Sequence, residues 1–147
     1  SVSVEMALRA WKGQVYAIEK KEDALALLKE NRRKFAADNL EIVPGTAPEA
    51  MVELPVPTHA FIGGSSGNMN EIIRLLLDKN PEVRIVINCI TLETVTEAMN
   101  AIRDFSLTDV DIVQLSAARS KSIGRYHMMM GENPIYIISC SGRGEEI

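Results

Sequence analysis

The sequence contains 147 residues, of which 46% are hydrophobic and 24% are charged, and its formal net charge is −4. This length and composition are typical of a single globular domain, here residues 1–147, that can bury a sizeable core. The negative charge argues against general nucleic-acid binding, and no apolar run approaches the roughly 18 residues of a membrane span. Because the first residues also lack a signal-peptide pattern, we expect a cytoplasmic protein that binds neither nucleic acid nor a membrane.

The sequence offers few residues for a metal site. Its two cysteines, Cys89 and Cys140, form no CxxC pair, and its two histidines are His59 and His127. A structural zinc site would need about four clustered ligands, so no metal centre is indicated. Both cysteines lie in apolar, strand-like runs, and we expect them to be reduced thiols in the core.

Helical and strand patterns alternate from the first residues onward. Apolar residues at helical spacing predict a first helix that includes Trp11 and ends at Gly13. The expected elements that follow are, in order, a strand at 14–18, a helix with apolar positions from 24 to 35, a strand at 40–43 and a short helix around 49–54.

The second half of the chain continues this alternation. Asn68 with Glu71, and Thr94 with Glu97, have the form of a helix N-cap and its reciprocal partner. The expected elements are a strand at 60–62, a helix over 69–77, a buried strand at 84–89 and a helix with apolar positions from 95 to 102.

The alternation predicts an α/β fold in which helices cover both faces of a parallel sheet. The pattern changes near the end, because the segment 118–133, which links strands at 111–115 and 135–139, has no helical periodicity. Two strands without a crossover helix are most simply antiparallel neighbours. We therefore predict a mainly parallel sheet with an antiparallel final strand.

Ligands of open parallel sheets bind at the carboxyl ends of the strands. The residues at these ends are Glu19, Gly45-Thr46-Ala47, Gly63-Gly64-Ser65 and Asn88. Glu19 suits a ribose diol, which it would bind through two hydrogen bonds; the alternative is a surface carboxylate beside two lysines. The glycine-rich turn at 63–67 either holds an anionic group at the start of a helix or only connects strand and helix. Asn88 is either a ligand-facing amide or a strand-end residue.

Several segments carry a resemblance to a known family. They are Val15–Lys20, Gly45–Ala50, Ala60–Ser65, Ile87–Glu93 and Tyr126–Ile135. Together they resemble the precorrin-6Y methylase family, the decarboxylating cobalt-precorrin C15-methyltransferases, over almost the whole chain. The resemblance implies a Rossmann-like class I methyltransferase that uses S-adenosyl-L-methionine. Its reaction methylates a ring carbon of a tetrapyrrole in cobalamin biosynthesis and removes CO2 from an acetate side chain.

The resemblance also implies roles for residues at the strand ends. Glu19 would bind the cofactor ribose and Ala47 the adenine. Thr46 stands where the family often has an acidic residue, so its contact with the adenine would be weaker. Gly63 and Gly64 are further candidates for the cofactor because of their place at the end of a strand. A strand and a glycine-rich loop are expected immediately before Ser1. Without them, we expect residues 1–147 to bind S-adenosyl-L-methionine weakly or not at all.

The segment 118–133 is locally basic. Its cationic residues within nine positions are Arg119, Lys121, Arg125 and His127, with no Asp or Glu among them. A positive cluster on an acidic protein suggests an anionic ligand, such as a carboxylated tetrapyrrole bound by Arg119, Arg125, Tyr126 and Asn88; the alternative is a solvated hairpin loop. His127 is either a proton donor in decarboxylation or a structural histidine.

The resemblance further implies a homo-oligomer, commonly a tetramer. Met128–Met130 would supply adaptable apolar surface for assembly, unless they pack on the protein's own core. Two other functions stay open, namely a methyltransferase for another small molecule and a non-catalytic binding or assembly domain. A nicotinamide-dependent dehydrogenase is disfavoured by the hairpin-like ending.

Overall fold

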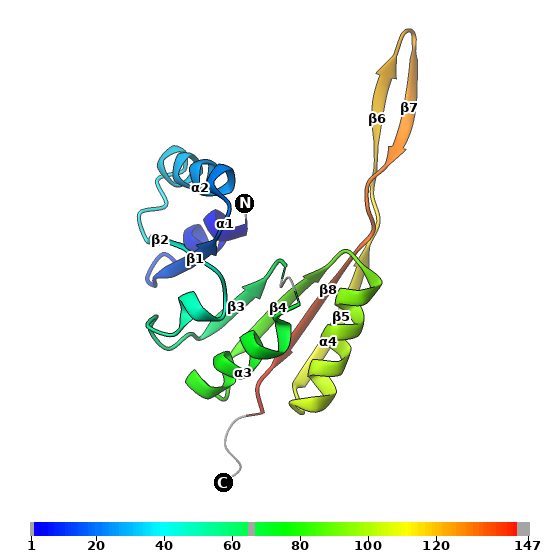
Figure 1. Ribbon diagram of the computed structural model, residues 1–147. Coiled ribbons are helices and arrows are strands. Elements are labelled where there is room, and N and C mark those ends of the chain that lie inside the picture. The colour runs from blue at the N-terminus through cyan, green and yellow to red at the C-terminus, as the bar shows by residue number, and fades with distance from the viewer. Residues whose placement is uncertain (1, 65–66, 144–147) are drawn as a thin grey trace. The chain divides into compact units, whose positions relative to one another are not determined.

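The computed structural model describes residues 2–64 and 67–143, and the chain divides into two compact units, Ser1–Pro55 and Val56–Ile147. Helices and strands alternate along most of the chain, as the sequence predicts (Figure 1). The result is an α/β fold whose parallel strands are joined by helices.

The first unit is built around two parallel strands. Its elements are α1 (Val2–Arg9), β1 (Val15–Glu19), α2 (Glu22–Lys34), β2 (Leu40–Pro44) and the 3-10 helix η1 (Glu49–Met51). β1 and β2 pair in parallel, with Val15 opposite Leu40 and Glu19 opposite Pro44. The buried side chains that hold α1 and α2 to these strands are Val4, Ala7, Val15, Ala17, Leu28, Ala37 and Leu40.

The first helix ends earlier than predicted. It stops at Arg9, so Trp11 lies in a turn and is 74% exposed, and Gly13 lies outside the helix. The side-chain amide of Asn39 lies within 3.0 Å of three carbonyl oxygens, those of Ala7, Ala10 and Gly13. The residue just before β2 therefore satisfies carbonyl groups in the last turn of this helix and in the turn after it. The periodicity of the helix residues does not reveal this contact.

The second unit contains a four-stranded sheet. Its elements are β3 (His59–Ile62), α3 (Met69–Lys79), β4 (Arg84–Cys89), α4 (Leu92–Asp104), β5 (Thr108–Leu115), β6 (Ala118–Ile123), β7 (Tyr126–Gly131) and β8 (Ile135–Ser141). The strand order is β3-β4-β8-β5. β3 and β4 are parallel, and β8 lies antiparallel between β4 and β5. The predicted antiparallel final strand is confirmed.

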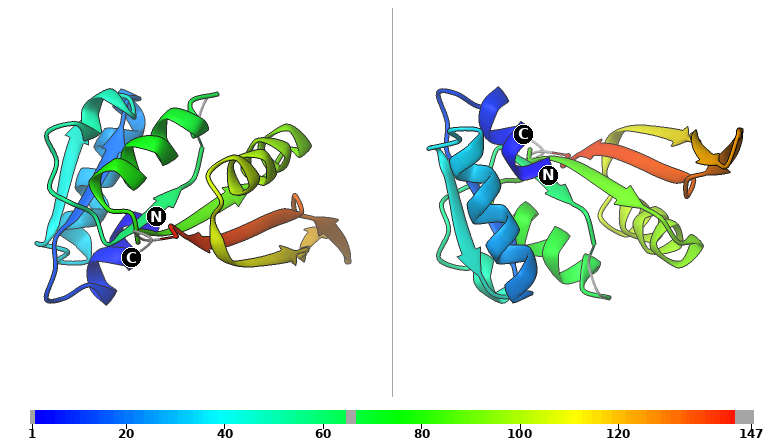
Figure 2. Two further views of the ribbon diagram at one scale, coloured as in Figure 1. Left: turned by 90° about the horizontal axis from the view of Figure 1, so that it is seen from below. Right: turned by 90° about the horizontal axis from the view of Figure 1, so that it is seen from above.

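Helices α3 and α4 cover one face of this sheet, as the views in Figure 2 show. That face carries fully buried side chains from β4 and β8, including Ile85, Ile87 and Ile138. Cys89 and Cys140 lie in the same layer as free, buried thiols, as predicted. Burial removes the thiolate from water, so the pKa of each thiol is raised; Glu97 adds to the effect at Cys89, and Arg84 opposes it at Cys140.

One of the two predicted helix caps is at its predicted position. Asn68 is the N-cap residue of α3, as predicted, although its side chain makes no capping hydrogen bond there. The cap of α4 is Thr91, whose hydroxyl accepts a hydrogen bond of 3.1 Å from the Thr94 amide, so the cap lies three residues before the predicted one and the helix begins at Leu92. None of the helices in residues 2–64 and 67–143 is long and apolar enough to cross a membrane.

The segment between β5 and β8 forms a β-hairpin of β6 and β7, which we call the arm (residues 118–131). The absence of a helix here agrees with the prediction. The arm continues the β5–β8 ribbon beyond the four-stranded sheet (Figure 1). Every residue of β6 and β7 is exposed.

Candidate ligand-binding edges of the two sheets

The carboxyl edge of the first sheet brings Glu19 together with Thr46 and Ala47. β1 ends at Glu19, and the Gly45 amide donates a 3.0 Å hydrogen bond to the Glu19 backbone carbonyl. Gly45 has a φ of 147°, and a Cβ atom there would lie 3.0 Å from the Cβ of Ala50. Glycine therefore allows the chain to turn directly at the end of β2 and keeps the next two residues beside β1.

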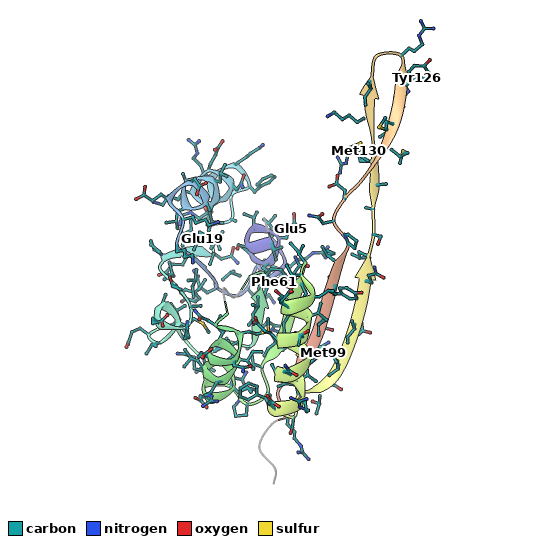
Figure 3. The ribbon with its side chains drawn as sticks, turned by 45° about the vertical axis from the view of Figure 1, so that its right-hand side comes forward. Glu5, Glu19, Phe61, Met99, Tyr126 and Met130 are labelled. Atoms are coloured by element: carbon teal, nitrogen blue, oxygen red, sulfur yellow. The ribbon has the colours of Figure 1, made fainter. Side chains whose placement is uncertain are left out.

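The Glu19 carboxylate is oriented by the backbone that follows it. Its Oε1 atom accepts hydrogen bonds from the amides of Lys20, at 2.8 Å, and Lys21, at 3.0 Å. The Oε2 atom makes no hydrogen bond within the part of the chain that the structure describes. A carboxylate has about four acceptor sites, so this group is pre-oriented and retains acceptor capacity (Figure 3).

The carboxyl edge of the second sheet brings Gly63 and Gly64 next to Asn88. In the β3–β4 register Ile62 lies opposite Ile87, so the next residues along the chain, Gly63 after β3 and Asn88 near the end of β4, are neighbours. A Cβ atom on Gly64 would meet no atom within 4 Å, which leaves the backbone there open to a ligand. Ser65 and Ser66, which complete the predicted turn, lie outside the described residues.

Asn88 carries an unsatisfied polar atom. Its Oδ1 is buried and has no hydrogen-bond partner among the described residues. Buried side-chain oxygens are normally paired, and leaving one unpaired costs about 1–3 kcal/mol. The atom is therefore a candidate acceptor for a donor group of a ligand.

The base of the arm lies at this same edge. β4 and β5 are both antiparallel to β8, so they run in the same direction. Asn88 and Val113 both lie opposite Ile137, and β5 ends two residues later at Leu115. A hydrogen bond of 2.8 Å from the Glu132 amide to the Ala117 carbonyl continues the ribbon into the arm.

The arm separates the predicted basic cluster onto two faces. Residues paired in an antiparallel ladder project to the same side. One face, the basic face, combines the pairs Arg119–Met130, Lys121–Met128 and Ile123–Tyr126. The other, the neutral face, combines Ala118–Gly131, Ser120–Met129 and Ser122–His127.

The predicted substrate residues are therefore spread along the arm. Arg125 lies in the turn and Tyr126, 72% exposed, lies at the tip (Figure 3). Four strand steps of about 3.3 Å separate Arg119 from the end of β6 at Ile123, roughly 13 Å, and Arg125 lies beyond that in the turn. The roles of Arg119, Arg125, Tyr126 and His127 at a substrate stay predictions.

Comparison with known proteins agrees with the resemblance in the sequence. A family model described as precorrin methyltransferase domain matches residues 1–141. The cobalt-precorrin-6B C(15)-methyltransferase (decarboxylating) of Salmonella typhimurium is 35% identical over 141 residues, which are 95% of this chain and 72% of that protein.

Solved structures share the fold. The precorrin-6y C5,15-methyltransferase of Geobacter metallireducens is 34% identical, with a TM-score of 0.86 over 96% of this chain and 75% of that chain. An S-adenosylmethionine-dependent O-methyltransferase of Thermotoga maritima is 14% identical, with a TM-score of 0.65 over 92% of this chain and 52% of that one, a likeness of fold alone. The fold is the Rossmann-like fold of class I methyltransferases, and the chain belongs to the precorrin methyltransferase family.

Proposed function

We propose that this chain acts as an S-adenosyl-L-methionine-dependent C-methyltransferase of cobalamin biosynthesis. Its substrate is a carboxylated tetrapyrrole of the cobalt-precorrin type, which also loses CO2 from an acetate side chain. The observation that carries the proposal is the match of the precorrin methyltransferase model to residues 1–141. The name of the Salmonella typhimurium relative supports the substrate and the decarboxylation. The compartment we propose is the cytoplasm, where thiols such as Cys89 and Cys140 stay reduced.

The residues at the carboxyl edge of the first sheet fit a nucleoside. S-adenosyl-L-methionine, when bound, supplies a methyl group on a sulfonium centre. Glu19 would accept hydrogen bonds from the ribose hydroxyls, because its Oε1 is held by two amides and its Oε2 is not. Thr46 and Ala47, kept beside β1 by the turn at Gly45, would contact the adenine.

The second sheet would position the substrate. Methyl transfer is an in-line displacement, so the protein mainly has to hold donor and acceptor in line, which can contribute several kcal/mol. Gly64 leaves open backbone for the cofactor, Gly63 lies beside it against the ring of Phe61, and the buried Oδ1 of Asn88 would accept a hydrogen bond from the substrate. Arg119 and Arg125 would attract the substrate carboxylates, which arginine can bind through two parallel hydrogen bonds.

We also propose that the protein is a homo-oligomer, possibly a tetramer, which assembles through the arm. A two-stranded hairpin alone is marginally stable in water. The arm nevertheless exposes Met128, Met129, Met130 and Tyr126, so the observed exposure argues against methionines packed on the chain's own core.

Calorimetry separates this function from the alternatives. The ligands are S-adenosylhomocysteine and NAD, and the proteins are the chain itself and a chimera with a relative's strand and glycine-rich loop before Ser1. We expect the chimera to bind S-adenosylhomocysteine and not NAD, and the chain alone to bind weakly. If the chimera bound neither ligand, the result would favour a non-catalytic assembly domain. In an activity assay, methylation of an unrelated small molecule would point to another substrate.

A further inference from the structure

Two turns of the first unit lie side by side at the edge of its sheet where the strands begin, which we call the amino edge. β1 starts at Val15 and β2 at Leu40, and these residues are opposite each other in the parallel register. The Val15 amide donates a 2.9 Å hydrogen bond to the carbonyl of Asn39, whose side chain also binds the turn after α1. The turns at 10–14 and 35–39 are therefore neighbours, at the opposite end of the strands from the carboxyl edge.

Each of these turns exposes an aromatic ring that has a lysine over it. Trp11 is 74% exposed, and the Nζ of Lys12 lies 4.5 Å from the centre of its ring. Phe35 is 50% exposed, and the Nζ of Lys34 lies 5.6 Å from the centre of its ring. Tryptophan is among the residues that most often dominate the energy of protein interfaces. Exposed rings in two neighbouring turns are therefore candidates for contact with a partner.

The two helices place positive charge at the same edge. The exposed or half-buried cations in their last turns and in the turns that follow are Arg9, Lys12, Arg32, Arg33 and Lys34. The acidic residue of these turns is Asp38. Cations suit the carboxyl ends of helices, but this preference does not account for the exposed rings beside them. The amino edge is thus basic, although the net charge of the chain is −4.

A hollow of about 610 Å³ lies at this edge, and its lining residues are Lys29, Glu30, Arg32, Arg33 and Asp38. The Nη1 atom of Arg32 donates a 3.3 Å hydrogen bond to the carbonyl of Leu40, the first residue of β2, which holds the guanidinium at the amino edge. Arginine can bind a carboxylate through two parallel hydrogen bonds. The hollow therefore offers cations for carboxylates next to the turn that carries Phe35.

We propose that the amino edge is a docking site for an acidic segment of another protein. The carboxylates of the segment bind in the hollow, and an apolar side chain of the segment packs on Trp11 and Phe35. The charge of the segment complements the basic edge, which favours its binding and its orientation. Because the site is at the opposite end of β1 from Glu19, the docked segment leaves the carboxyl edge open to a ligand.

Two other occupants fit the amino edge less well. The phosphates of a nucleic acid continue past these cations onto an acidic chain, and Glu30 and Asp38 line the hollow itself. A second copy of the chain would have to bring a different, acidic surface to the basic edge. Such a contact is heterologous and forms open filaments unless its rotation closes a ring.

The fluorescence of Trp11 tests the proposal at the site itself, because Trp11 is the one tryptophan of the sequence. The probe is a soluble peptide in which glutamate and leucine alternate. Two comparison peptides carry glutamine in place of glutamate or serine in place of leucine. We expect the first peptide to shift the emission to shorter wavelength and to shield it from acrylamide, and each comparison peptide to bind about tenfold more weakly. Equal binding of the glutamine peptide, or unchanged emission at millimolar peptide, would overturn the proposal.

Matched charge reversals in the first unit test where the peptide binds. Arg33→Glu changes the amino edge, whereas Lys20→Glu makes the same change of charge at an exposed residue directly after β1, at the carboxyl edge. We expect Arg33→Glu to weaken binding of the peptide by about tenfold, Arg33→Gln to weaken it less, and Lys20→Glu to leave it nearly unchanged. Equal losses in the two reversed variants would show attraction by net charge alone and would contradict a docking site.

The same measurements with other probes decide between the occupants. We expect a single-stranded oligothymidylate to leave Trp11 accessible to acrylamide, and Arg33→Glu to leave the mass of the protein in light scattering unchanged. Stronger shielding by the oligonucleotide than by the peptide would assign the amino edge to a nucleic acid. A lower mass of the variant would assign it to a second copy, and either result would overturn the proposal.

Discussion

At the scale of single residues, Glu19 illustrates how local backbone prepares a side chain for a ligand. Two amides, from Lys20 and Lys21, hold one carboxylate oxygen at the end of β1. The position of this residue could be predicted from the sequence, since an acidic residue ends an apolar run. The fixed direction of its carboxylate could not, because it depends on the turn made by the following residues.

We predict that Glu19→Gln weakens S-adenosylhomocysteine binding by about 1–3 kcal/mol, the usual cost of losing a charge-assisted hydrogen bond. The measurement is calorimetry on the chimera with the glycine-rich loop. Glu41→Gln, an exposed carboxylate on β2, is the matched control and should leave the affinity unchanged. If the Glu19 variant and the Glu41 control bound S-adenosylhomocysteine with equal affinity, Glu19 would not be the residue that binds the ribose.

A second residue-scale prediction concerns Gly142. A Cβ atom at this position would overlap the carbonyl oxygen of Pro81, and its amide donates to the Val83 carbonyl at 2.9 Å. Gly142→Ala should therefore lower the free energy of unfolding by about 1–3 kcal/mol, as overpacking does. Urea denaturation measures this, and Gly13→Ala, whose Cβ would make only ordinary contacts, should have a much smaller effect.

At the scale of helices and strands, most elements follow from periodicity, and their ends do not. The strands near Val15, Ala60 and Arg84 are at their predicted places because apolar runs of this length favour buried parallel strands. The end of α1 depends on Asn39, more than thirty residues after Ala7 in the sequence. Helix ends are set by such partners, which a local pattern does not contain.

The buried thiols of β4 and β8 predict a pH dependence of stability. Because folding raises the pKa of Cys89 and Cys140 above their usual value of 9.0, the unfolded state loses these protons first. Stability is then fully present below about pH 9 and falls as the pH rises through the raised values, by up to about 1.4 kcal/mol per pH unit for each thiol.

Chemical denaturation between pH 8 and 10 measures this slope. A variant with Cys89→Ala and Cys140→Ala should be less stable at all pH values because it lacks two buried sulfur atoms, but its stability should fall less steeply with pH. Parallel curves for the two proteins would exclude the thiols as the cause.

At the scale of the whole molecule, the arm is where the sequence was least informative. Its lack of helical pattern and its positive charge were evident, and both are present in the structure. That Arg119 and His127 lie on opposite faces depends on the hairpin register, which places His127 opposite Ser122. A one-residue change of register would reverse this assignment.

We predict that Arg119→Ala combined with Arg125→Ala raises the Michaelis constant for a carboxylated tetrapyrrole, because cations that attract its carboxylates are lost. Affinity for S-adenosylhomocysteine should change little, since Glu19 is unaffected. Steady-state kinetics and calorimetry on the same variant test both statements. Weaker cofactor binding with unchanged tetrapyrrole kinetics would show that the arm is not a substrate site.

The central claim is tested most directly by following a labelled methyl group and CO2 in one reaction. The chimera with the glycine-rich loop is incubated with methyl-labelled S-adenosyl-L-methionine and a cobalt-precorrin-type tetrapyrrole that carries its acetate side chains. We predict that label enters the tetrapyrrole and that CO2 is released in equal amount. A protein that binds S-adenosylhomocysteine yet transfers no label to the tetrapyrrole would contradict the proposed function.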